Sequence, residues 1–188
     1  EPSQKKAQLN GKSALNAKEF FTAFPVVIFS PEKMTLFEKG PSGRRAFLDR
    51  AVFLMEDDYL EKVRRYTYVL KTRNFLLREK KDKKELEVWT EAFIETALPV
   101  ISKRNKFLKD ILPEVENNHY IITERKERID FEIKEETDDH IETNLRKRLE
   151  KSLEREKNLG YTIIGPHTEG PVFLLNGKPI QNFSSQGQ

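Results

Sequence analysis

The sequence predicts an α+β fold in which a mainly helical arm is inserted into part of a sheet. Three observations carry this prediction. Residues 25–29 form a continuous apolar run with the length and β-branched content of a buried strand. Long, charged segments follow, in which apolar residues recur at helical spacing. Strand-like runs then return in the last third of the chain, so the order is sheet, helical insertion, and sheet again.

The first forty residues combine a turn, two helices and the buried strand. Asn10-Gly11 is a hairpin signal. Residues 15–24 carry phenylalanines at helical spacing, and the strand at 25–29 follows them. Ser30-Pro31 predicts the start of a short helix, because serine is a good N-cap and proline is tolerated at the first helical position. Gly40-Pro41 is expected to end that helix.

The next helix is predicted to begin at Ser42, which can cap it. Its inward-facing side chains are expected to be Phe47, Leu48 and Ala51.

Arg44 and Arg45 fall in the first turn of this helix, where positive charge opposes the helix macrodipole. Two explanations stay open. One is local pairing, for instance of Arg45 with Asp49 one turn later. The other is an external anion, either a phosphate or an acidic partner.

Two long helices with apolar stripes predict an antiparallel helical hairpin. The first follows Asp57-Asp58, whose carboxylates suit a helix N-terminus. The stripe lapses in the charged run 80–84, which predicts the turn. The second helix carries its stripe from Leu86 to Ile111, and Pro99 should kink it or split it in two.

The last third contains one more helix and several strands. Thr137 can cap a helix that ends near Gly160. Asn176-Gly177 predicts a turn toward Ile180. Four short apolar runs are predicted strands: His119–Ile122, Ile129–Ile133, Tyr161–Ile164 and Val172–Leu175.

Composition excludes several classes of site. Cysteine is absent, which removes disulfides, thiol nucleophiles and thiolate metal ligands and agrees with a reducing compartment. The three histidines are scattered, so no metal cluster is expected. No apolar run approaches the roughly 18–20 residues that span a bilayer, and no signal-peptide pattern opens the chain. We expect a soluble, cytoplasmic protein. The net charge of +3 says little about partners.

Four motifs stand out along the chain: Phe29-Ser30-Pro31-Glu32 with Gly40-Pro41 and Arg44-Arg45-Ala46-Phe47-Leu48-Asp49; Leu70–Leu77; Tyr161–His167; and Ser185-Gln186-Gly187-Gln188. In this order and at these plausible spacings, they resemble the RecF family of bacterial recombination proteins. Thr72 stands where that family usually has glutamine, and residues 168–170 lack its usual basic residue and acid, so no role is assigned there.

The resemblance implies part of an ABC-type ATPase head with an inserted arm. Residues 1–40 and 160–188 would belong to the head, and residues 41–159 would form the arm with a small strand pair. In such heads ATP clamps two subunits together. Ser185, Gly187 and Gln188 would then contact the nucleotide held by the partner subunit. A turn leading into a helix N-terminus suits this task, because its free N–H groups bind anions.

Other parts of an ATP site are not found. The sequence has no Gly-x-x-x-x-Gly-Lys-Ser/Thr loop and no apolar strand ending in paired acids. The chain therefore resembles a middle fragment of RecF. The intact protein would use ATP and Mg²⁺ as a weak DNA-dependent ATPase, whereas this chain alone is expected neither to bind a cofactor nor to hydrolyse ATP.

The RecF resemblance further implies DNA binding at gaps and at junctions of single and double strands. It implies an ATP-dependent homodimer that works with RecO and RecR to place RecA. Basic residues are our candidates for DNA or partner contact, and those of 71–84 and 103–109 could form one stripe along the hairpin. The candidates are Arg44, Arg45, Lys71, Arg73, Arg78, Lys80, Lys81, Lys83, Lys84, Lys103 and Arg104.

Two other interpretations stay open. Basic residues on a helix are often only a solvated face, and Tyr66, Tyr68 and Trp89 are more often packed than used to stack bases.

The hairpin could also be a protein-binding scaffold with no nucleotide role. A phosphate loop encoded upstream and an aspartate-rich strand end downstream would favour the ATPase head. Another SMC-like ATPase would need a long heptad coiled coil, and these helices are too short.

Overall fold

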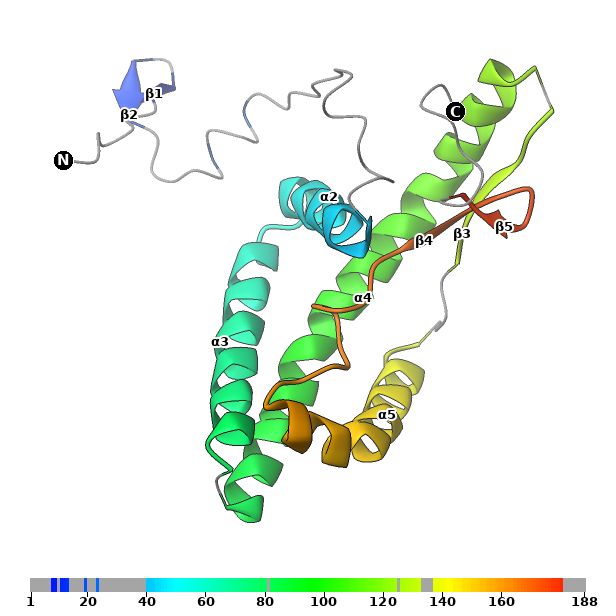
Figure 1. Cartoon of the computed structure of the whole chain (residues 1–188). Coiled ribbons are helices and arrows are strands. Elements are labelled where there is room, and N and C mark those ends of the chain that lie inside the picture. Colours follow the sequence, from blue (N-terminus) through cyan, green and yellow to red (C-terminus); the bar gives the residue numbers. More distant parts are fainter. Residues whose placement is uncertain are drawn as a thin grey trace.

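The computed structural model describes residues 8, 9, 11–13, 19, 23, 40–80, 82–124, 126–132 and 137–180. Helices dominate these residues, and a small antiparallel sheet accompanies them (Figure 1), so the α+β class is confirmed. The elements are β1 Gln8–Leu9, β2 Lys12–Ser13, α2 Gly40–Met55, α3 Tyr59–Arg78, α4 Lys83–Ile122, β3 Ile129–Glu132, α5 Asp138–Leu159, β4 Val172–Leu175 and β5 Lys178–Pro179.

The predicted helical hairpin is confirmed and forms the frame of the molecule. Helices α3 and α4 run antiparallel, side by side, and α2 crosses near the end opposite their turn (Figure 1). Their facing side chains form one core, in which Val69 of α3 and Phe93, Ala97 and Val100 of α4 are buried. Burial of these apolar stripes stabilises two charged helices that would be marginal alone.

Helix α4 differs from its prediction. It continues across both Pro99 and Pro113 as far as Ile122. Of the two outcomes predicted at Pro99, a kink or a split, the split is therefore wrong. The predicted strand at His119–Ile122 is also wrong, because these residues form the last turn of α4. Each proline removes one backbone hydrogen bond. Complete or nearly complete burial of the residues around Pro99 offsets that loss, with Ala97 at 0% and Val100 at 1% exposure.

The sheet order is β3-β4-β5, with all pairs antiparallel. Phe131 lies opposite Phe173 in the register. Their rings meet edge to face with centroids 5.0 Å apart. Asn176 and Gly177 both have positive φ, at 50° and 76°, and connect β4 to β5. The strands predicted at 129–133 and 172–175 and the Asn-Gly turn are thereby confirmed, as is the hairpin around Gly11 that joins β1 to β2.

Helix α5 has the predicted caps. The Thr137 hydroxyl accepts a hydrogen bond from the His140 amide at 3.3 Å. Gly160 ends the helix in the left-handed conformation, at φ 76°. Its buried face, with Ile141, Leu145 and Leu149, packs toward α4. The sequence was sufficient to predict both ends of α5, because a helix cap depends only on residues within one turn of it.

Three local predictions need correction. Helix α2 begins at Gly40, so Ser42 lies inside its first turn. Phe47 is 45% exposed, while Leu48 and Val52 are buried, so the inward face of α2 lies one position further along. Residues 161–164 form no strand.

Other predictions fall outside the described residues. They are the strand at 25–29, the helix starting at Ser30-Pro31 and most of the helix at 15–24. The domain boundaries at 40 and 160 stay predictions.

Gly160→Ala should lower the free energy of unfolding by roughly 1–2 kcal/mol, because a Cβ disfavours the left-handed conformation. A methyl group there would lie 3.5 Å from Cα of Arg78, an ordinary contact, so the loss is conformational. Urea denaturation followed by circular dichroism measures it. Gly160→Asn should lose less, because asparagine tolerates this conformation; equal losses for the two variants would contradict the explanation.

Candidate functional site

The most constrained irregular stretch is Tyr161–Pro171, here called the return segment, which connects α5 to β4. Three arginines donate to its backbone carbonyls: Arg104 to Pro166 at 2.6 Å, Arg45 to Thr168 at 3.0 Å and Arg44 to Pro171 at 2.9 Å. A segment without strand partners must satisfy its carbonyls in another way, and guanidinium donors give strong bonds. Helices α2 and α4 thus hold the return segment in place.

Arg44 is only 4% exposed, and its burial, with the charge of Arg45 beside it, lowers the pKa of its guanidinium group. The first-turn arginines of α2 therefore have an intramolecular use that neither sequence explanation foresaw. They hold carbonyls that lie more than 120 residues further along the chain.

A second anchor is the ion pair between Arg73 of α3 and Glu156 of α5. Both side chains have 0% exposure, and the charged atoms lie 2.8 Å apart. Arg73 also donates to Thr90 at 3.0 Å and Thr162 at 2.6 Å. Glu156 also accepts from the amide of Ile163 at 2.8 Å. Arg73 is among the candidates for DNA or partner contact, but its side chain is fully buried and presents no surface to an external partner.

A third anchor is His167. The Tyr66 hydroxyl lies 2.5 Å from Nδ1 of His167, and Nε2 lies 2.9 Å from the carbonyl of Thr162. A carbonyl can only accept, so Nε2 carries the proton and Tyr66 donates to Nδ1. Burial lowers the pKa of His167 and raises that of Tyr66. Tyr66 is therefore a packed, hydrogen-bonded residue rather than a stacking platform.

Gly165 allows the return segment to pass close to α4. Its φ is +135°, and a methyl group on it would lie 2.8 Å from Cζ of Phe93. Only glycine fits this approach without displacing the Phe93 ring.

The basic residues of 103–104 lie against α2. Arg104 donates from two nitrogens to Asp49, at 2.8 and 2.9 Å. Tyr59 donates to the same carboxylate at 2.6 Å. Lys103 pairs with Glu56 at 2.6 Å. These two charges, about 30 Å along α4 from the hairpin turn, are thus paired with Asp49 of α2 and with Glu56 directly after it, and they do not extend the predicted stripe.

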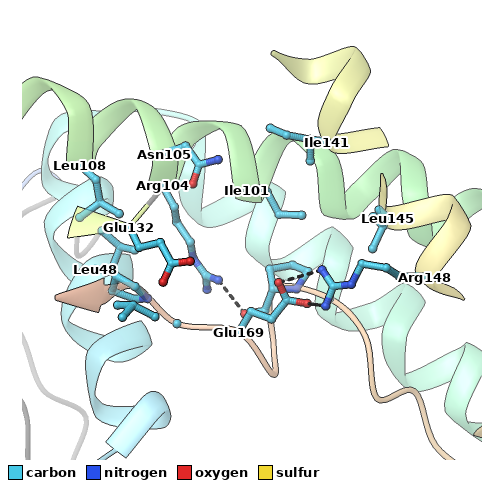
Figure 2. Close-up of a pocket in the computed structure, with 15 residues that line it drawn as sticks. Leu48, Ile101, Arg104, Asn105, Leu108, Glu132, Ile141, Leu145, Arg148 and Glu169 are labelled. Atoms are coloured by element: carbon cyan, nitrogen blue, oxygen red, sulfur yellow. Dashed lines mark hydrogen bonds and ion pairs between the residues drawn. The ribbon is translucent and has the colours of Figure 1, made fainter. Parts of the chain in front are cut away.

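A cavity of about 200 Å³ lies between α4, α5, the return segment and the sheet. Figure 2 shows its apolar wall, which includes Leu108 and Leu145, and the ion pair of Arg148 with Glu169 beside it. The shorter contact of that pair measures 2.5 Å. The two arginines lining the cavity both bind groups of the protein itself.

Several of the predicted basic candidates lie at the hairpin turn. We call Arg78, Lys80, Lys83 and Lys84, all of which are exposed, the hairpin tip. Lys71 on α3 is also exposed, whereas Lys81 lies outside the described residues. A cluster of exposed cations such as the hairpin tip can contact phosphates without reading sequence.

Two findings limit the chemistry within the described ranges. No group of three or more histidine, aspartate or glutamate side chains there could hold a metal ion. None of the helices there is long and apolar enough to cross a membrane. The predicted nucleotide contacts Ser185, Gly187 and Gln188 lie beyond residue 180 and outside the described part.

Sequence reasoning missed the buried pair, although the spacing contained a signal. Arg73 continues the core positions Tyr66 and Val69 of α3, and Glu156 continues Leu149 and Ser152 of α5 at helical spacing. A charge at a core position predicts a buried partner. The spacing cannot say which partner.

Comparison with known proteins gives consistent results. No family model matches the chain. It is 33% identical to the DNA replication and repair protein RecF of Syntrophotalea carbinolica, covering 98% of this chain and 52% of that protein. It is 34% identical to RecF of Geotalea uraniireducens, with the same coverage. The chain spans about half the length of the curated relatives it matches.

Solved structures agree. A structure of the recombination mediator protein RecF with ATPrS matches with a TM-score of 0.85 and 30% identity, over 98% of this chain and 52% of that one. A structure of RecF with ATP matches with a TM-score of 0.84, also at 30% identity, over 96% of this chain and 51% of that one.

The class is therefore the predicted one, a partial ABC-ATPase head that carries an inserted helical hairpin. The particular resemblance is confirmed as well: over nearly its whole length this chain is similar to RecF in both sequence and fold.

Glu156→Leu should lower the free energy of unfolding by roughly 3–5 kcal/mol, because it leaves Arg73 charged and buried without its partner. Urea denaturation measures the loss. The double variant Arg73→Met/Glu156→Leu should lose clearly less than the two single losses added together. Additive losses would show that the two side chains act independently.

Stability should fall on mild acidification because of His167. Burial lowers its folded pKa below the ordinary value of 6.5, so the unfolded chain binds more protons near and below that pH. The His167 contribution is complete above pH 6.5 and is lost as the pH decreases through that value. Urea denaturation at pH 7.5 and 5.5 tests this, with His167→Gln as the control. The variant should lose less stability between the two pH values than the wild type; equal losses would contradict the assignment.

Proposed function

We propose that this chain is part of a RecF-like DNA replication and repair protein that acts as an ATP-dependent DNA clamp. The observation that carries the proposal is the joint likeness to RecF, at 30% or more identity and a TM-score of 0.85, over 98% of the chain. A fold match alone would be a weak argument for function, because one fold serves many functions. Here the match in sequence accompanies the match in fold.

The nucleotide role rests on the C-terminal motif. We propose that Ser185, Gly187 and Gln188 contact ATP bound to a second subunit, as the Ser-x-Gly-Gln pattern implies. The matched RecF structures are complexes with ATP and ATPrS, which supports nucleotide use by the intact protein. Mg²⁺ would accompany the nucleotide. The return segment leads toward this motif through β4 and β5, so its anchors would also help to position the motif.

The DNA role rests on the exposed basic residues. The hairpin tip and Lys71 are candidates for phosphate contact because their side chains are in solvent. Arg45 stays a candidate on the same ground, since it is partly exposed. The preferred target would be DNA at gaps and at junctions of single and double strands. The matched structure comes from the RecFOR pathway, which supports RecO and RecR as partners in placing RecA on the DNA.

A second candidate function has one observation in its favour. Val88 is 67% exposed and Tyr68 64% exposed on the outer surface of the hairpin. Exposed apolar side chains of this size favour a protein-binding scaffold if they act together. The two functions differ in the response to salt, because phosphate contacts weaken steeply as salt increases.

Reversing the charge of the hairpin tip should weaken DNA binding by this chain. The variant Lys80→Glu/Lys83→Glu/Lys84→Glu replaces three phosphate-attracting charges with repelling ones. Fluorescence anisotropy with gapped, duplex and single-stranded DNA across a salt series measures it. We expect wild-type binding that falls steeply with salt, and at least tenfold weaker binding by the variant at low salt.

The matched control is Lys109→Glu/Lys147→Glu/Lys151→Glu, which makes the same change of net charge at exposed lysines on α4 and α5. It should retain most of the binding. If both variants lose binding equally, the net charge rather than the hairpin tip is responsible. Absence of wild-type binding at low salt would favour the protein-binding scaffold.

A further inference from the structure

The outer face of α3 carries an ordered pattern that the fold does not use. Five exposed residues follow one another at spacings of four, three, four and three, which places them on one side of the helix. They alternate between cations and aromatic rings. We call these residues, Arg64, Tyr68, Lys71, Phe75 and Arg78, the α3 outer stripe.

The rings of this stripe are unusually exposed for their size. Tyr68 is 64% exposed and Phe75 is 47% exposed, whereas the core residues Tyr66 and Leu76 beside them are 4% and 3% exposed. The rings therefore add little to the core. One aromatic contact holds Tyr68: Trp89 of α4 meets its ring edge to face at 6.1 Å. Trp89 thus supports Tyr68 from one side and leaves the other side open.

The charges of the stripe are weakly compensated. The nearest recorded acid contact of Arg78 is to Glu79 at 4.0 Å, between exposed side chains. Glu61 and Glu79 flank the stripe at its two ends, and Arg65 beside it pairs with Glu95 of α4 at 3.5 Å. Exposed pairs at these distances contribute little. Successive members of the stripe are separated by about 4.5–6 Å of rise along the helix axis, and the whole stripe spans about 21 Å.

We infer that the α3 outer stripe is a contact surface for single-stranded nucleic acid. Proteins that bind single strands without sequence preference combine cations along the backbone with aromatic side chains on which bases stack. An acidic protein would match the cations as well, but the regular alternation of cation and ring matches the alternation of phosphate and base along a single strand. The inference rests on the proposed DNA role and names the part of the hairpin that would contact the unpaired strand. Arg78 belongs to both the stripe and the hairpin tip, and duplex phosphates are left to the other members of the tip, Lys80, Lys83 and Lys84.

Ring removal tests the inference. The probes are a fluorescein-labelled oligothymidine of about 15 nucleotides and an abasic oligonucleotide of the same length, which keeps the phosphates and lacks the bases. Tyr68→Ala and Phe75→Ala should each weaken binding of oligothymidine by about tenfold, in line with the loss of one stacked base. Both should bind the abasic strand as the wild type does.

Two controls separate stacking from folding. Tyr68→Phe keeps the ring and should bind like the wild type. Tyr120→Ala removes a tyrosine with 46% exposure at the far end of α4 and should change nothing. Trp89 is the only tryptophan in the sequence. Its fluorescence should change when oligothymidine binds to the wild type and not when it binds to Tyr68→Ala.

Several results would overturn the inference. One is that both ring variants bind oligothymidine as tightly as the wild type does. Another is that the variants lose as much affinity for the abasic strand as for oligothymidine. The third is that the wild type does not bind oligothymidine at low salt. If the wild type binds poly-glutamate as tightly as it binds oligothymidine, the inference is overturned and an acidic protein is the better partner. If duplex binding depends on the hairpin tip while ring removal has no effect, the stripe is overturned and the proposed DNA role stands.

Discussion

The fully buried ion pair of Arg73 with Glu156 is the interaction on which most of this structure depends. It joins the C-terminal part of α3, near the hairpin turn, to the last turn of α5, and through Thr162 and Ile163 it also holds the start of the return segment. Both charges are out of water, so each is tolerable only while the other is present. Helices α3 and α5 and the return segment must therefore be assembled together.

The rest of the return segment extends the same constraint. Its carbonyls have no strand to pair with, and arginines of α2 and α4 replace that partner. His167, bonded on both ring nitrogens, and Gly165, pressed against Phe93, fix its middle. A segment held at so many points moves with the hairpin or not at all. In the proposed function this links the arm to the part of the chain that approaches the nucleotide motif.

Two groups of basic residues have different tasks. Arg44, Arg73 and Arg104 face inward and satisfy carboxylates or carbonyls, and the fold needs them whatever the protein binds. The hairpin tip and the cations of the α3 outer stripe face solvent. Of these two groups, only the second is available to an external phosphate. Net charge hides this division, because the inward group is matched by buried or half-buried acceptors.

The sequence by itself determined the elements whose causes are local: the hairpin of α3 and α4, the Thr137 and Gly160 caps of α5, strands β3 and β4, and the Asn176-Gly177 turn. Its four motifs also determined the likeness to RecF. Only the tertiary structure decided that α4 continues through Pro99, that 161–164 is not a strand, and that Arg73 faces Glu156 rather than DNA. Caps, turns and apolar periods act within a few residues. The partner of a buried charge lies 83 residues away for Arg73, and only the folded chain brings the two together.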